Sequence, residues 1–381
     1  MPKPDHNFRT DPNRAVYVFG EFKDELIAKL LPQIEVFRAT NNDPISVFIN
    51  SPGGSVRCLD LLSGALRAQN PDGQHCRIIT CSNGDAASAA ATMLALGDYA
   101  ISHAHSLIHF HGMRLTDPEI TVTMEDASQL ATYLDRRNRE IAAKLADFML
   151  PRLIHRYFRL KGDFQKIRDH SQNQNLADMA CFAEAIKKRV SNSCVKVIEK
   201  SIRRLARIQS LSQVFNKPIV GRTKDPLKQD VAVFNQVIQH EIRENKGKKW
   251  RLDENGVSHV VSDYFLLRDY YFGEHKEAVD PVVEIFGIEF LQDTEFKEYE
   301  KLIKSSPEEA KKLLFKKSKT ILEPFWYFTV CIARHLQQGE NRLSATDAYW
   351  IGAVDEVLGT DCFGLRSAIE LEPDNGQPQQ A

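Results

Sequence analysis

The chain has 381 residues, a length that favours two domains, or one domain with a large insertion, at about 150 residues per domain. Hydrophobic residues make up 43% and charged residues 27% of the chain, which excludes disorder throughout. The 50 Lys and Arg residues balance 51 Asp and Glu residues, which argues against a surface devoted to nucleic acid.

The cysteines and the apolar segments indicate the compartment. Seven scattered cysteines without a Cys-x-x-Cys pair are typical of buried thiols in a reducing compartment, not of a disulfide framework or a zinc ribbon. Residues 1–14 carry no apolar signal segment, and the apolar stretch Ala86–Leu96 is far shorter than the roughly 20 residues that span a bilayer. We therefore expect a soluble, cytoplasmic protein without a membrane partner.

The first part of the chain, residues 1–149, alternates strand and helix patterns. Short β-rich runs fall at residues 15–19, 45–49, 77–81, 99–101 and 106–110, and helical spacing falls between them at 22–37, 56–68 and 86–96. This alternation predicts parallel βαβ units with right-handed crossovers, and hence an α/β fold.

The second part, residues 150–325, is rich in Lys, Arg and Glu and reads mostly as helices. Ser306-Pro307 predicts a helix start, and Asn255-Gly256 predicts the turn of a hairpin over residues 250–261. The aromatic runs at 264–267 and 270–272 are expected to form the core of this part.

A basic segment lies within this second part, between Lys187 and Arg222. Without interleaved aromatic side chains for base stacking, it favours a solvated helix face over a nucleic-acid surface. The third part, residues 326–370, returns to compact apolar patterning, and the Pro- and Gln-rich tail, residues 371–381, is expected to be disordered.

Two backbone features in the first part suggest chemistry. A glycine turn, Gly53-Gly54, follows a strand, and glycines there leave amide groups open to a ligand. Ser88 lies at a strand-to-helix junction, where the field of the helix end and its free amides favour a nucleophile. A tetrahedral oxyanion needs amide donors, and the N–H groups of Gly54 and Ala89 are the candidates.

Histidines supply the candidate base. His109 is flanked by apolar strand residues that would fix its ring, so it is the natural partner for Ser88. His103, His105, His109 and His111 are separated by even numbers of residues, so on one strand all four side chains could point the same way. This leaves a metal-dependent hydrolase as an alternative. Four neighbours along one strand span too much length to bind one ion together, so no metal and no cofactor is expected.

These residues resemble a known family. Ile49–Ser55, Ala86–Ser88 and Leu107–His109 occur in the order and contexts of the ATP-dependent Clp protease proteolytic subunit, a serine peptidase with the ClpP/crotonase fold. Arg14–Glu21 looks like the first strand of that family, and Leu343–Asp355 looks like its final helix and turn. The resemblance implies a ClpP/crotonase-like α/β fold of repeated βαβ units, interrupted by a mostly α-helical insertion at residues 150–325.

The resemblance also implies roles for individual residues. Ser88 matches the nucleophile, His109 the general base, and the amides of Gly54 and Ala89 the oxyanion hole. Glu340 occupies the position of the family's Asp, with the neighbouring Asn341 as an alternative group to orient the ring. An extended substrate is expected to bind beside the glycine turn and the segment after the base, at Gly53, Ser55, His111, Gly112 and Met113.

The implied partners are a polypeptide substrate and further copies of the chain. The stretch before the first strand is shorter than the family's axial loops, which leaves docking to an AAA+ unfoldase open. A second hypothesis is a catalytically weak or inactive scaffold of the same fold, or an acyl-thioester enzyme that uses the oxyanion hole alone. The Glu at the acid position and the large insertion, which would bind a partner, favour this second hypothesis.

Overall fold

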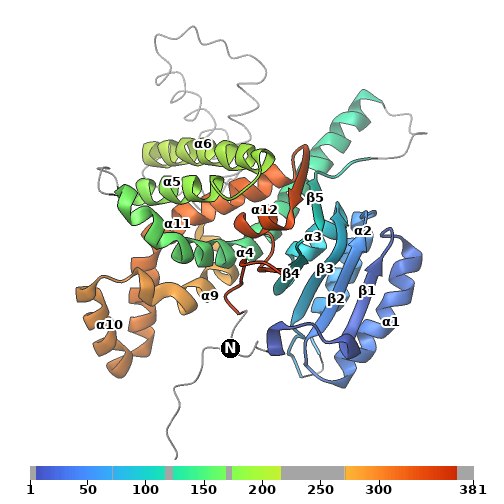
Figure 1. The fold of residues 1–381 in the computed structure, drawn as a ribbon, viewed down its shortest axis with the longest axis horizontal. Helices are drawn as coiled ribbons and strands as arrows, with labels where there is room; N and C mark the ends of the chain where they lie inside the picture. Colours follow the sequence, from blue (N-terminus) through green and yellow to red (C-terminus); the bar gives the residue numbers. More distant parts are fainter. Residues whose placement is uncertain are drawn as a thin grey trace, which may run out of the picture.

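The computed structural model describes residues 6–70, 72–115, 123–168, 174–215, 270 and 272–366. A twisted β-sheet with its own helices lies beside a larger group of helices (Figure 1). The chain enters the sheet, leaves for the helical group and returns to the sheet at its end.

The sheet has seven strands among the described residues and is mainly parallel. Five of them follow the order β1 (Ala15–Phe19), β2 (Ile45–Ser51), β3 (Ile78–Ala87), β4 (Tyr99–His103) and β7 (Glu356–Leu358). β5 (Leu107–His111) runs parallel to the end of β3, and β6 (Glu340–Ser344) pairs with β5 in the antiparallel direction. The prediction of an α/β fold with parallel βαβ units is confirmed.

Three helices connect the strands of the first part: α1 (Asp24–Thr40), α2 (Val56–Arg67) and α3 (Ala89–Ala95). Every residue of α3 is buried, and most are alanines, which allow the helix to approach the sheet closely. The Thr80 hydroxyl on β3 donates to the Leu94 carbonyl at 2.7 Å and fixes this helix on the strand beneath it.

The second part is helical, as expected. Its helices are α4 (Met124–Arg168), α5 (Gln174–Lys187), α6 (Asn192–Phe215), α9 (Lys276–Phe286), α10 (Asp293–Ser305) and α11 (Pro307–Leu336), and α12 (Ala345–Trp350) follows β6. Short 3-10 turns lie at His6–Phe8, Pro12–Arg14, Phe272–Glu274 and Gly287–Phe290. The helix start at Pro307 is confirmed, whereas the expected hairpin at 250–261, the run 264–267 and the tail 371–381 lie outside the described residues. Tyr270 and Phe272 are 1% and 2% exposed, so this part of the expected core is confirmed.

The expected boundaries at 149/150 and 325/326 both fall inside long helices. α4 and α11 continue through them, with Pro151 and Pro324 in their interiors. One apolar core includes residues of the sheet and residues of the helical group. The division into separate domains therefore stays a prediction, with each boundary lying within a continuous helix.

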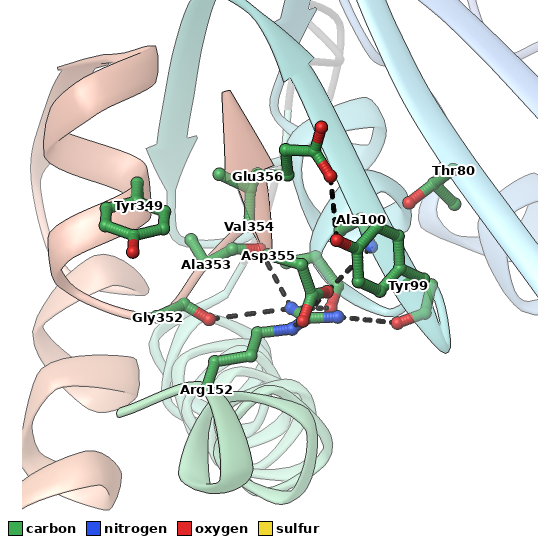
Figure 2. Close-up of polar contacts among 12 residues, drawn as sticks. Thr80, Tyr99, Ala100, Arg152, Tyr349, Gly352, Ala353, Val354, Asp355 and Glu356 are labelled. Carbon is green, nitrogen blue, oxygen red and sulfur yellow. Dashed lines mark hydrogen bonds and ion pairs between the residues drawn. The ribbon is translucent and has the colours of Figure 1, made fainter. Parts of the chain in front are cut away.

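A buried arginine of α4 joins the beginning and the end of the chain (Figure 2). Arg152 is 4% exposed and donates to the carbonyls of Ala95 at 2.8 Å, Gly97 at 2.6 Å and Ala353 at 2.9 Å. Its Nε lies 2.8 Å from Asp355 Oδ2, which also accepts from the Ala100 amide on β4. The segment before β7 is thereby fixed against β4.

A second arginine, one helical turn later, is fully buried. Arg156 donates to the carbonyls of Tyr349 at 3.1 Å, Val354 at 2.7 Å and Asp355 at 2.9 Å. Its guanidinium lies over the Tyr349 ring, 3.9 Å from the centroid. Because carbonyl oxygens buried without a donor are costly, this side chain stabilises the irregular segment that leads back into the sheet.

Candidate active site

Ser88 lies in a strained turn between β3 and α3. Its φ of 57° makes it the one non-glycine residue with positive φ in the part of the chain that the structure describes. The Ser88 amide donates to the His109 carbonyl on β5 at 2.7 Å, which holds the turn against the neighbouring strand. A left-handed serine at a strand-to-helix junction is typical of nucleophile turns, where tertiary contacts maintain the strain.

The glycine turn packs directly on this serine. A Cβ added to Gly53 would lie 2.5 Å from the Ala87 carbonyl oxygen and 2.6 Å from Ser88 Cβ. Gly53 and Gly54 both have positive φ, at 91° and 140°. Only glycine therefore fits at position 53, for its conformation and for its space.

The amides of the glycine turn point in different directions. Phe22 accepts from Ser55 and donates to Gly53, so it uses both of its backbone groups in a parallel bridge beside Gly54. In such a bridge the N–H of the facing residue points to the other side, so the Gly54 amide points away from Phe22. The Gly53 amide donates to Ser51 Oγ at 3.0 Å. Ala89 begins α3, and a first helical residue has no acceptor for its N–H within the helix.

His109 lies on β5 next to the nucleophile turn. It pairs with Ala87 on one side and with Arg342 on the other, while His111 pairs with Glu340. Residues opposite each other in an antiparallel pair share a face of the sheet. The side chains of His109, His111, Glu340 and Arg342 therefore share one face of the β5–β6 pair.

Glu340 contacts the imidazole and an arginine at once. Its Oε2 lies 2.7 Å from His109 Nε2, and its Oε1 contacts the Arg114 guanidinium. The Nε2–Oε2 distance is that of an ion pair, but the two groups are not aligned for a hydrogen bond. Among the described residues, the buried Nε2 atom has no hydrogen-bond partner. Nor does a hydrogen bond join Ser88 Oγ to His109 within these residues. The structure thus brings the three predicted catalytic side chains into one region, with the imidazole turned to Glu340.

The surroundings of His109 favour a neutral ring. Burial is the main cause that lowers the pKa of His109 below 6.5, and the positive charges of His111, Arg342 and Arg114 add to it. A carboxylate this close would raise the pKa, but Arg114 pairs with the same carboxylate and offsets its charge. A neutral imidazole at pH 7 is the state that a general base requires.

Asn341 does not orient the His109 ring, so that alternative is wrong. Its Nδ2 donates to the carbonyls of His335 at 3.0 Å and Gln338 at 2.9 Å, at the end of α11. Since it pairs with Phe110, its side chain lies on the opposite face of the strand from Glu340.

The expected substrate-binding segment after the base is tied to the helical part. The Met113 amide donates to Asn138 Oδ1 on α4 at 2.8 Å, and a His111 ring nitrogen lies 2.7 Å from the Gly112 carbonyl oxygen. The amides of Gly53, Ser55 and Met113 are therefore engaged within the protein. An added strand at this site would use other groups of the segment, or would displace Asn138.

The sequence suggested that the four histidines share one strand, and the structure shows that they do not. His103 ends β4, His105 lies in the turn that follows, and His109 and His111 lie on β5. Their rings form two separate pairs, His103 with His105 and His109 with His111, with centroids 5.5 Å apart in each. Within the described ranges, no three or more His, Cys, Asp or Glu side chains cluster as metal ligands would.

Comparisons with known proteins identify the first part of the chain. The family model described as Clp protease matches residues 7–147. The chain is 30% identical over 129 residues to ATP-dependent Clp protease proteolytic subunit 2 of Pseudomonas aeruginosa, covering 32% of this chain and 62% of that protein. It is 29% identical over 139 residues to proteolytic subunit 1 of Mycobacterium tuberculosis, covering 34% and 66%.

The first part of the chain, residues 7–147, is ClpP-like. The resemblance expected from the sequence is thus confirmed, and the matched segment includes Ser88 and His109 of the ClpP-like site. The chain spans about two thirds or less of the length of these curated relatives, and Glu340 lies outside the matched segment. None of the helices described for this ClpP-like protein is long and apolar enough to cross a membrane.

Sequence reasoning overlooked two arginines of the ClpP-like site. Arg114 holds the carboxylate of Glu340, and Arg342 lies across the strand pair from His109. Arg342 would follow from the sequence only if residues 340–344 were recognised as a strand beside 107–111, and the resemblance pointed there to a helix and turn.

Proposed function

We propose that this ClpP-like chain is a serine endopeptidase of the Clp type. The observation that carries the proposal is the left-handed turn at Ser88, packed on Gly53 and bonded to the backbone of His109. In this proposal the half-buried Ser88 acts together with the His109 imidazole and the amides of Gly54 and Ala89. A nucleophile, a base and paired oxyanion donors are the parts that acyl transfer from a peptide requires.

The proposed reaction has two stages. Ser88 Oγ attacks a peptide carbonyl while His109 takes its proton, and the amides of Gly54 and Ala89 stabilise the negative oxygen. His109 then returns the proton to the leaving amine, and water hydrolyses the acyl-enzyme by the same route. Glu340 orients the imidazole and stabilises its positive charge.

Substrate must complete the geometry. Since Nε2 of His109 faces Glu340, the ring and the carboxylate have to shift before the ring accepts a proton from Ser88. Catalytic hydrogen bonds are often long or misaligned without substrate and tighten in the complex. A peptide strand beside Gly54 and the segment after His111 would exclude water and favour that shift.

The proposed partners follow from the same reading. The substrate is an unfolded polypeptide, the chain associates with copies of itself, and it acts in the cytoplasm. A monomeric mass in light scattering would count against self-association. Delivery by an AAA+ unfoldase stays open, and ATP-dependent stimulation of cleavage by such a partner would test it.

Cleavage of unfolded casein tests the central proposal. We expect the wild-type protein to cleave casein and Ser88→Ala to lose this activity. The matched control is Ser305→Ala, because Ser305 is exposed on α10 and bonds only to its own helix. Equal cleavage by wild type and Ser88→Ala would contradict the assignment.

A second candidate is a scaffold of the same fold with weak or no activity. The contact of Glu340 with Nε2, the nitrogen that would face Ser88, favours this candidate. In this reading the helical insertion at residues 150–325 binds a partner. A protein that neither cleaves casein nor reacts with a fluorophosphonate, yet binds a partner through that insertion, would support it.

A further inference from the structure

Arg342 is a charged group of the site that the proposed reaction does not use. It lies directly opposite His109 in the β5–β6 pair, and its side chain is exposed. Residues opposite each other in an antiparallel pair have Cβ atoms about 5 Å apart and side chains on the same face. The guanidinium therefore projects from the face that carries the imidazole.

The charges around Arg342 leave it available to a ligand. Glu340 is the acidic residue on this face of β6, but its carboxylate contacts His109 and Arg114. Within the described part of the chain, Arg342 forms no ion pair. Two guanidinium groups thus face one carboxylate, which leaves an excess of one positive charge beside the base.

The charge of Arg342 acts on the imidazole. Arg342 and Arg114 are both among the groups whose positive charge lowers the pKa of His109. Such an influence requires a short separation, because exposed charges are screened within about 10 Å at ordinary ionic strength. The geometry of the strand pair and the electrostatics of the ring agree on the position of Arg342.

We infer that this site selects peptides with an acidic side chain next to the scissile bond, with Arg342 as the selecting residue. The inference rests on the proposed function, since the site binds substrate only if Ser88 attacks there. A guanidinium offers a planar pair of donors that matches a carboxylate, whereas a lysine of the peptide would be repelled. Acidic peptides are therefore the substrate class that the site favours.

Binding measurements test the selection without requiring catalysis. The probes are fluorescein-labelled peptides in sets of three, and the members of a set differ only in carrying Glu, Gln or Lys at one position. Each set tests a different position beside a fixed cleavage point. The peptides are titrated into Ser88→Ala protein. We expect the Glu peptide to bind about three- to tenfold more tightly than the Lys peptide at the best position. The preference should shrink between about 0.05 M and about 0.5 M NaCl, as expected for a screened contact.

Charge variants identify the residue responsible. In the Ser88→Ala background, Arg342→Gln should abolish the preference and Arg342→Glu should reverse it. The control is Arg203→Gln, which removes an exposed arginine from α6 and should leave the preference unchanged. Equal affinities for the Glu and Lys peptides, no binding of any of them, or a preference that survives Arg342→Glu would overturn the inference.

Turnover of the same peptides by the wild-type protein separates the two proposals. Cleavage with a higher kcat/KM for the Glu peptide supports both. A binding preference that depends on Arg342, without any cleavage, supports the selection and contradicts the peptidase. Cleavage without a charge preference supports the peptidase and contradicts the selection.

Discussion

The Nε2 atom of His109 lies 2.7 Å from Oε2 of Glu340, and Arg114 contacts the other oxygen of the same carboxylate. In a working Ser-His-acid triad the acid contacts the ring nitrogen that does not face the serine. The position of the Glu340 carboxylate therefore decides between the active peptidase and the inactive scaffold. Arg114 helps to set that position.

Substitution of Glu340 tests its role in orienting the base. Glu340→Gln should lower kcat at least about tenfold with little change in KM, because an amide does not stabilise an imidazolium ion. Glu340→Asp keeps the charge and should retain more activity than Glu340→Gln. Glu309→Gln, an exposed change on α11, serves as the control. An unchanged kcat in Glu340→Gln would mean that another group orients His109.

The pH dependence of kcat/KM tests the charges around the base. A protonated imidazole accepts no proton, so kcat/KM falls as the pH falls through the pKa of His109. Burial and neighbouring positive charges lower this pKa, so the midpoint should lie below 6.5. Arg114→Gln and Arg342→Gln each remove a positive charge and should move the midpoint upward, whereas Arg203→Gln should not. A midpoint that stays fixed in both site variants would contradict the description of the ring's surroundings.

Two glycines with similar conformations separate backbone strain from crowding. Gly53 and Gly20 have φ values of 91° and 86°, but only a Cβ at Gly53 would meet other atoms, namely those of the nucleophile turn. Both Ala variants should lose about 1 kcal/mol of stability from the conformation alone. Gly53→Ala should also slow the reaction of Ser88 with a fluorophosphonate more than tenfold, as an order-of-magnitude expectation. Equal labelling rates for the two variants would show that Gly53 does not support the turn.

Urea unfolding tests the buried arginine of α4. Arg156→Met should lower the free energy of unfolding by about 3 kcal/mol, because it removes the guanidinium donor from the buried carbonyls of Val354 and Asp355. Arg136→Met is the control, since that side chain is 73% exposed and pairs only with Glu140 at the surface. Its effect should stay below about 1 kcal/mol. Similar losses for the two variants would contradict the role given to Arg156.

Local patterns sufficed for much of the fold. The strand Ile45–Ser51 and the helix Val56–Arg67 lie close to their predicted ranges, because alternating and helical apolar spacing decides such segments. β3 was expected to end near Cys81, before the turn residues Asn83-Gly84-Asp85, but it continues to Ala87. The Asn50 side chain accepts from the Asp85 amide, and Ala86 pairs with β5, so tertiary contacts override the local turn preference.

The site was less accessible to sequence reasoning. The motif order brought Ser88, His109 and the glycine turn together, and the structure finds them adjacent. The strand Glu340–Ser344 was not expected, because it forms only by pairing with β5, more than two hundred residues earlier in the chain. The pairing places Arg342 opposite His109 and brings Glu340 to Arg114. It also places the Asn341 side chain on the face of the strand opposite to Glu340.

Mapping the residue that a fluorophosphonate modifies tests the central claim most directly. The wild-type protein is treated with the reagent, digested and analysed by mass spectrometry, beside Ser88→Ala and His109→Ala. The account predicts one modified peptide that contains Ser88, with modification lost in Ser88→Ala and strongly slowed in His109→Ala. Modification of another residue, or none in the wild-type protein, would contradict the assignment of Ser88 as the nucleophile.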